Sequence, residues 1–340
     1  MNENITAYER ALVRFEEWLA PLLRDDGSLA TPGLPCWACM SLPAYAHVTG
    51  KRELLARTIL HIEREWERDD RFFHHPALAG MLPYVPAWML SGAAWAGHVR
   101  LREKLVALIL SFQDAKTGGL FGAEAHRQAG AGEIEFDSTT HACAALCLAG
   151  RIAEADRMGQ YLAMLVNAQP DADRFFLVWD TGCGLVRGFD PATAKERVLD
   201  PKVPRQYLYK SGLLIRALAL LHLATGKRTC LDLARQHCQW VASRFPEFWR
   251  VTLSHKMAWA AVALFEATGD RAHLTITRQV ADYLVELQQP DGSFRYPELW
   301  PTSAVNLEDK IDAGCQFGTW IALARLACLP GQEPLLRTIG

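Results

Sequence analysis

The chain has 340 residues, of which 50% are hydrophobic and 22% are charged, and 36 basic against 38 acidic residues leave a formal net charge of −2. This composition is typical of a folded globular protein with a large core, and it excludes intrinsic disorder and a collagen-like repeat. No cluster of lysine and arginine is dense enough to neutralise a run of phosphates, so nucleic acid is not an expected partner.

One class of segment has the apolar spacing of an amphipathic helix. The clearest example places Val280, Tyr283, Leu284 and Leu287 at i, i+3, i+4 and i+7, with charged residues on the other face. This pattern predicts helices that lie on the surface and turn one face to the core. In chain order, these outer helices are expected at about 8–23, 52–67, 98–113, 153–167, 229–244 and 272–289.

A second class of segment alternates with the first and is apolar on all faces. It is rich in alanine, glycine, serine and cysteine, as in 140–148 and 257–265, and helices of this kind are buried all round. We expect such inner helices near 35–48, 84–97, 138–149, 206–225, 254–268 and 311–328. Inner and outer helices that alternate six times predict an all-α fold, a single (α/α)6 barrel that spans residues 1–340.

The links between helices differ at the two ends of the predicted barrel. A Thr-Gly pair ends three inner helices, at 49–50, 225–226 and 268–269, where glycine suits the left-handed position before a short link. The opposite links are long and contain proline and aromatic residues, as in 114–137 and 168–205. Long loops gathered on one face favour a functional mouth at the N-terminal ends of the inner helices.

No feature of the sequence indicates a membrane span, export or a cofactor. The longest apolar stretch, 212–224, is interrupted by Arg216 and His222 and is shorter than the ~20 residues that cross a bilayer. The start of the chain lacks the pattern of a signal peptide, so we expect a cytoplasmic protein with reduced thiols. The expected partner is a small-molecule substrate. The Cys36 and Cys39 pair has no second pair or histidine at zinc spacing, so no metal is expected.

A glutamine followed by a glycine and an aromatic residue recurs after the outer helices. The best copy is Gln288 with 292–294, and a second copy is Gln113 with 119–121. These segments resemble the QW repeats of the terpenoid cyclase and protein prenyltransferase α/α toroids. The six-hairpin glycosidases carry similar turns and are the close alternative.

The segment 135–142 provides the candidate acid. Its sequence, Glu-Phe-Asp-Ser-Thr-Thr-His-Ala, resembles the acidic motif of class II terpenoid cyclases, and the resemblance implies that Asp137 protonates the substrate with Glu135 and His141 as neighbours. The other interpretation is an ordinary N-cap, with Asp137 or Ser138 bonding the first free amides of the helix. Aromatic residues at inner-helix positions are the candidate walls of the cavity: Trp37, Tyr84, Trp88, Tyr207, Trp259 and Trp320.

Further polar residues are expected at the mouth. Asp312 forms with Asp137 the kind of acid pair that a sugar-processing site needs. A lysine at the start of an apolar inner helix, such as Lys210 or Lys256, is costly unless it meets an anion, and we expect an internal ion pair for at least one of them. The remaining candidates for substrate binding are His75, Arg205, His255 and Gln316.

These observations lead to one functional hypothesis and two alternatives. The first is a cyclase or isomerase without metal or cofactor, in which Asp137 acts as general acid on an apolar, terpenoid-like substrate. The second is a carbohydrate-active enzyme, a glycoside hydrolase, lyase or epimerase that uses Asp137 with Asp312. The third is a toroid that binds a ligand without catalysis, because a fold does not determine a function.

Overall fold

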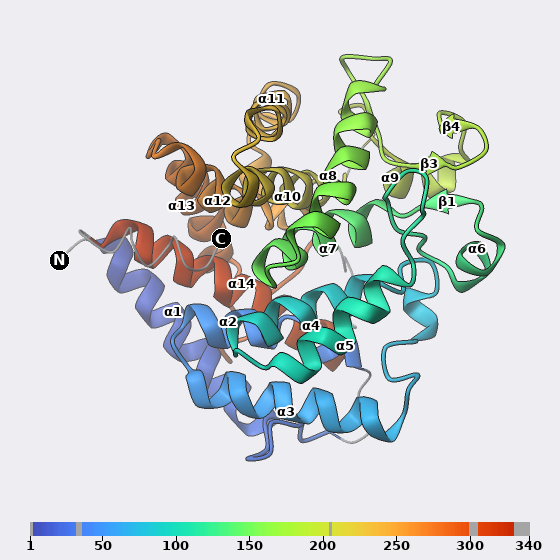
Figure 1. Cartoon of the computed structure of the whole chain (residues 1–340). Helices are drawn as coiled ribbons and strands as arrows, with labels where there is room; N and C mark the ends of the chain where they lie inside the picture. Colours follow the sequence, from blue (N-terminus) through green and yellow to red (C-terminus); the bar gives the residue numbers. More distant parts are fainter. Residues whose placement is uncertain (1–2, 32–35, 204–205, 299–304, 330–340) are drawn as a thin grey trace.

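The computed structural model describes residues 3–31, 36–203, 206–298 and 305–329, and helices dominate it (Figure 1). In these ranges six helices follow one another around a ring, each in contact with the next, and α14 contacts α2 to close it. This closed inner ring confirms the predicted all-α toroid. Its members are α2 (Leu42–Val48), α4 (Tyr84–Trp95), α7 (Phe136–Leu148), α10 (Tyr209–Thr225), α12 (Met257–Thr268) and α14 (Leu307–Cys328).

An outer layer of helices packs against the ring: each outer helix after the first contacts the inner helix that precedes it in the chain, and the first contacts α14. The amphipathic pattern explains this position, because each outer helix buries one apolar stripe and leaves its charged face in water. The outer helices are α1 (Glu3–Leu19), α3 (Arg52–Arg68), α5 (Val99–Leu110), α8 (Ile152–Asn167), α11 (Arg228–Arg244) and α13 (Ala272–Glu286). None of the helices in the described ranges has the length and apolar character needed to span a bilayer.

The first inner helix differs most from its prediction. It was expected from residue 35 but begins at Leu42, and Cys36–Cys39 forms the 3-10 helix η2. Pro43 explains the late start, because proline lacks an amide hydrogen and is tolerated only in the first turn of a helix. The last inner helix begins earlier than expected, at Leu307, because the side chain of Asn306 accepts the amide of Asp309 at 2.9 Å and caps it.

The long loops on the mouth side contain short elements that the sequence did not predict. β1 (Glu133–Ile134), β3 (Trp179–Asp180) and β4 (Gly184–Leu185) form an antiparallel sheet in which Glu133 lies opposite Asp180. A second pair joins β2 (Phe175–Phe176) to β5 (Val198–Leu199). The other loop elements are η1 (Ala20–Leu22), η3 (Pro76–Leu78), α6 (Glu124–Ala129), η4 (Pro191–Thr193), α9 (Ala194–Arg197), η5 (Phe248–Arg250) and η6 (Thr252–Ser254).

The turn residues behave largely as expected. Gly50, Gly226 and Gly269 have φ values of 74°, 72° and 72°, which confirms the left-handed helix ends. The glutamines of the repeated motif close the turn rather than the helix end: Gln113 donates to the Gly118 carbonyl at 2.9 Å, and Gln288 to the Gly292 carbonyl at 3.1 Å. The motif is therefore a structural device of this helical barrel.

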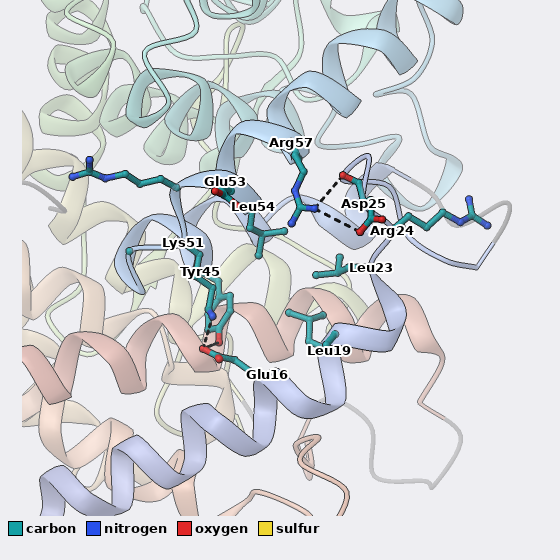
Figure 2. Close-up of a pocket in the computed structure, with 13 residues that line it drawn as sticks. Glu16, Leu19, Leu23, Arg24, Asp25, Tyr45, Lys51, Glu53, Leu54 and Arg57 are labelled. Atoms are coloured by element: carbon teal, nitrogen blue, oxygen red, sulfur yellow. Dashed lines mark hydrogen bonds and ion pairs between the residues drawn. The ribbon is translucent and has the colours of Figure 1, made fainter.

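A surface cleft of about 670 Å³ lies between the end of α1 and the start of α3 (Figure 2). Four of its charged residues contact one another in two pairs, Lys51 with Glu16 and Arg57 with Asp25. Lys51 Nζ lies 3.0 Å from Glu16 Oε1, the hydroxyl of Tyr45 donates to the same oxygen at 3.1 Å, and Arg57 donates to the Asp25 carbonyl at 3.1 Å. None of the predicted site residues lines this cleft.

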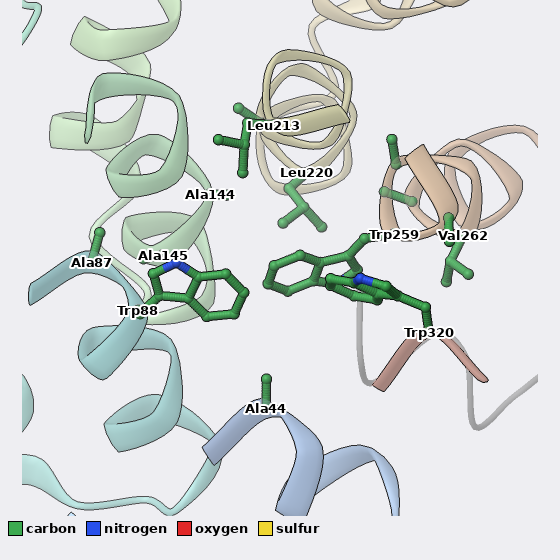
Figure 3. Packing of buried hydrophobic residues seen from close by; sticks show 14 of the residues in the cluster. Ala44, Ala87, Trp88, Ala144, Ala145, Leu213, Leu220, Trp259, Val262 and Trp320 are labelled. Carbon is green, nitrogen blue, oxygen red and sulfur yellow. The ribbon is translucent and has the colours of Figure 1, made fainter. Parts of the chain in front are cut away.

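Three tryptophans fill the interior of the ring. Trp88 of α4, Trp259 of α12 and Trp320 of α14 are at most 1% exposed, and their rings follow one another at centroid distances of 5.3 and 5.0 Å (Figure 3). Small side chains such as Ala87 and Ala145 lie around them and make room for the large rings. We call these three residues the tryptophan floor, and they make the ring a packed core rather than an open channel.

Candidate active site

Four charged side chains are buried where the inner helices begin. Asp137, Lys210, Lys256 and Asp312 lie at or near the first residues of α7, α10, α12 and α14, and none is more than 7% exposed. Lysine and aspartate are almost never buried to this degree unless they are paired or functional. The ring therefore brings together at one end four residues that lie far apart in the sequence.

Asp137 and Lys210 form a buried ion pair. Lys210 Nζ donates to Asp137 Oδ2 at 2.6 Å, and the hydroxyl of Tyr209 donates to the same oxygen at 3.3 Å. This confirms the expectation of an internal ion pair for at least one of the two lysines. The second carboxylate oxygen, Oδ1, is buried and accepts no hydrogen bond, so it remains available to a ligand.

Glu135 explains why Asp137 is free to make this pair. It is the N-cap residue of α7, and its carboxylate accepts the backbone amides of Asp137, at 2.9 Å, and of Ser138. The prediction that Asp137 or Ser138 caps the helix is therefore wrong, because the side chain one turn earlier already holds these amides. Burial, with the nearby charge of Asp137, raises the pKa of Glu135 to about 7.

Asp312 has a different environment. Gln316 Nε2 donates to its Oδ2 at 2.8 Å, and Ser41 Oγ lies 2.7 Å both from its Oδ1 and from its backbone carbonyl. A hydroxyl has only one hydrogen, so both contacts of Ser41 are satisfied when Asp312 is protonated and donates to it. In agreement, burial raises the pKa of Asp312 to about 7.

Lys256 is enclosed by aromatic rings. Its Nζ lies 4.4 Å from the ring centre of Tyr209, 5.8 Å from that of Tyr84 and 5.9 Å from that of Trp88. No carboxylate of the described residues lies within ion-pairing distance of Nζ, and burial lowers the pKa of Lys256 to about 8, although Asp312 and Asp137 oppose this. Lys256 thus differs from Lys210 in having no protein anion as a direct partner.

Two histidines lie between the mouth and the tryptophan floor. His141 packs 4.5 Å from the ring of Trp88, and neither of its ring nitrogens has a hydrogen-bond partner. His255 Nδ1 accepts the indole hydrogen of Trp320 at 3.0 Å, so in the neutral ring the hydrogen is on Nε2. Burial lowers the pKa of both histidines well below the usual value, so both are neutral.

A cleft of about 530 Å³ opens beside Asp137. Glu133 and Arg197 form an ion pair at this cleft, and Tyr207, Tyr209 and Lys210 line it on the side of α10. Asp137 is one of four carboxylates that line this cleft, with Glu133, Glu135 and Glu196. Tyr209 joins the two halves of the site, because its hydroxyl bonds Asp137 while its ring faces Lys256.

The remaining predicted residues have the following contacts and positions. Trp37 and His75 contact each other with ring centres 6.3 Å apart, and Arg205 falls outside the described residues. Trp88, Trp259 and Trp320 form the floor and are at most 1% exposed. Asp180, in the loop beyond the site, accepts the amides of Gly182 and Cys183 and closes its turn.

Sequence reasoning missed two residues of the site. Tyr209 is the first residue of α10, and a correct helix start would have placed it beside Lys210 at the mouth. Ser41 precedes α2 in the chain, and only the closure of the ring brings it to Asp312. No local pattern signals such a contact between residues 271 positions apart.

The sequence matches no known protein family and no curated protein, but the fold has many counterparts among solved structures. A GH76 alpha-1,6-mannanase from Salegentibacter sp. HEL1_6 superposes with a TM-score of 0.67 at 13% identity, over 93% of this chain and 99% of that chain. A D-mannose isomerase superposes with a TM-score of 0.62 at 11% sequence identity, over 92% of this chain and 97% of that chain. An unsaturated glucuronyl hydrolase specific for heparin superposes with a TM-score of 0.59 at 12% sequence identity, over 95% of this chain and 96% of that chain.

These likenesses establish the fold and correct the predicted resemblance. The expectation of a terpenoid cyclase is wrong: the toroid resembles glycoside hydrolases and a sugar isomerase, which was the alternative. An inactive variant of the mannanase, with two aspartates replaced by asparagine, has been solved in complex with alpha-1,6-mannotriose. The physical reason for the error is that the glutamines of the repeated motif only close turns in this chain, and that Glu135 of the acidic motif is a helix cap.

Proposed function

We propose that this protein is an enzyme that acts on a sugar or a short oligosaccharide by acid–base catalysis at the mouth of the barrel. One observation carries the proposal: two buried aspartates at this mouth are held in opposite ways. A lysine is bonded to Asp137, whereas burial raises the pKa of Asp312, which is hydrogen-bonded to the uncharged side chains of Ser41 and Gln316. Environments that separate two carboxyl groups in this way are typical of an acid and a base in one site.

The arrangement fits the cleavage of a glycosidic bond. In this reaction a carboxylic acid protonates the departing oxygen, while a carboxylate attacks the anomeric carbon or activates the water that does so. We assign the acid to Asp312, which still holds a proton near neutral pH. We assign the carboxylate to Asp137, whose Oδ1 is free while Lys210 and Tyr209 fix Oδ2.

A second candidate, sugar isomerisation, is supported by His141. This histidine is neutral, fully buried beside Trp88, and has no partner for either ring nitrogen. A neutral imidazole can take a proton from one carbon of an open-chain sugar and return it to the next. The fold is also that of a D-mannose isomerase.

The test uses α- and β-linked oligosaccharides of neutral and acidic sugars, together with free aldoses. New reducing ends would report hydrolysis, and a ketose would report isomerisation. We expect Asp137→Asn and Asp312→Asn to lower kcat by roughly 10²- to 10⁴-fold, which is the usual contribution of acid–base catalysis. Asp232→Asn is the matched control, because Asp232 is exposed on α11, where its carboxylate pairs with Arg228.

Thermal unfolding separates loss of catalysis from loss of structure. The melting temperature of Asp312→Asn should stay close to that of the wild type, since the change keeps the shape of the side chain. Asp137→Asn leaves Lys210 buried without its charged partner, so its melting temperature should fall, and activity is compared at a temperature at which both variants are folded. Full activity in either variant would refute the assigned acid pair. A wild-type protein that neither converts nor is stabilised by any sugar of the panel would refute the proposal as a whole.

A further inference from the structure

Lys256 is the charged group at the mouth that the proposed mechanism does not use. It is 4% exposed, and it begins α12 with three aromatic rings around its ammonium group. Aromatic faces attract a cation, but they replace only part of the water that it loses on burial. Burial of a charged lysine in this position lowers the stability of the ligand-free protein, and an anionic ligand would offset this loss.

The charges around Lys256 leave it without compensation. The charge of Asp137 is already neutralised by Lys210, at 2.6 Å. Asp312, the other acid near Lys256, bonds Ser41 and Gln316 instead, and the double contact of Ser41 fits its protonated form. Lys256 is therefore the buried lysine of the mouth that has no carboxylate within ion-pairing distance among the described residues, whereas Lys210 has Asp137.

We propose that Lys256 binds an anionic substituent of the sugar substrate, namely the carboxylate of a sugar acid. The inference rests on the proposed function and narrows it to acidic sugars. A single ammonium group matches the single charge of a carboxylate, whereas a phosphate dianion is usually held by several donors. The second buried lysine of the mouth is not available for such a dianion, because it is bonded to Asp137.

The position of Lys256 also fits a substrate that reaches the acid pair. Tyr209 contacts both halves of the site: its hydroxyl bonds Asp137, and its ring faces the ammonium group of Lys256. A sugar ring that lies against Tyr209 would place its reacting centre near Asp137 and its carboxylate near Lys256. Aromatic rings and a few convergent polar groups are the usual composition of such a pocket.

The experiment compares matched probes by calorimetry at pH 7. Each pair differs only at C6, which is a carboxylate in the first sugar and a hydroxymethyl group in the second: D-glucuronate against D-glucose, and D-mannuronate against D-mannose, with D-glucose 6-phosphate as the phosphate arm. We expect the wild type to bind a uronate at least tenfold more tightly than its neutral partner. Lys256→Met, which keeps the length of the side chain but removes its charge, should abolish this preference, and Lys256→Arg should keep most of it.

The outcomes separate this inference from the proposed function. If neutral sugars bind as tightly as uronates, the role of Lys256 is refuted and the sugar enzyme stands. If only the phosphate binds, the carboxylate is refuted as the ligand. If no sugar binds, both proposals fail, and a preference that survives in Lys256→Met refutes the assignment to this residue.

A pH series on the wild type tests the same point without a variant. The amine loses its charge as the pH rises through about 8 in the free protein, so the preference for uronates should be present at pH 6–7 and decline above pH 8. The groups that face Lys256 from the neighbouring helices are Tyr84 of α4, Asp137 and His141 of α7, Tyr209 and Lys210 of α10, and Asp312 of α14. A preference that stays constant up to pH 10 would contradict the proposal.

Discussion

The mouth of the barrel and the tryptophan floor are both buried but differ in their charge. The floor consists of closely spaced tryptophan rings and small side chains. The indole nitrogens of Trp88 and Trp259 are buried without a hydrogen-bond partner among the described residues, but they carry no charge. The mouth holds the ion pair of Asp137 with Lys210, an acid, Asp312, whose pKa burial raises to about 7, and Lys256, which forms no ion pair with a described residue. Uncharged packing therefore explains most of the floor, whereas the buried charges of the mouth cost stability and favour a ligand-binding role.

The largest effect is expected in the floor. Trp259→Ala removes a ring that stacks on two other tryptophans, and loss of a buried aromatic side chain costs about 3–5 kcal/mol. Urea denaturation would measure the change in the free energy of unfolding. Trp249→Ala is the matched control, because Trp249 is half-buried on η5, and an equal loss in both variants would contradict the special role of the floor.

The ion pair of the mouth should come next. Lys210→Met leaves Asp137 buried without its partner, which costs about 3 kcal/mol in the free energy of unfolding. The double variant Lys210→Met with Asp137→Leu removes both charges and should recover most of this loss. A double variant as unstable as the single one would show that packing, rather than the unpaired charge, sets the cost.

A smaller effect concerns pH. The pKa of Asp312 is about 7 in the folded protein and close to 4 in an unfolded chain. Between these values the folded state binds more protons, so this residue makes stability fall as the pH rises from about 4 to 7. Asp312→Asn should lose this dependence, and parallel pH curves for the two proteins would disprove the assignment.

The smallest effect is expected in the surface cleft. Glu16→Gln breaks the ion pair with Lys51. The side chain of Lys51 is 35% exposed and that of Glu16 is 37% exposed. Exposed pairs of this kind contribute about 0–1 kcal/mol, so the melting temperature should change by no more than a few degrees. A loss as large as that of Lys210→Met would show that this cleft, too, contains a group held for a ligand.

Much of the fold could be predicted from the sequence, because its signal is local. Alternation of amphipathic and wholly apolar segments places the inner and outer helices, and Gly50, Gly226 and Gly269 mark where inner helices end. The small strands could not be predicted, since β1 and β3 pair across 45 residues and each has only two residues. The late start of α2 follows from Pro43, which belongs in the first turn of a helix; the predicted helix from residue 35 placed this proline in its interior.

The site could be predicted only in part. The prediction that the inner helices all begin at the same end of the barrel correctly placed four residues together there, because all inner helices point the same way. These residues are Asp137, Lys210, Lys256 and Asp312. Which lysine meets which acid depends on how helices from distant parts of the chain rotate against each other. The role of Glu135 as a cap was missed because a helix boundary is uncertain by one or two residues.

The tryptophan floor has one more consequence for any ligand of this protein. A ring filled with indoles is closed at one end, so a molecule that enters at the mouth must leave by the same route. No long polymer can be threaded through the barrel, and entry of one molecule has to wait for the exit of another. The residence time of a ligand is therefore set by the mouth alone.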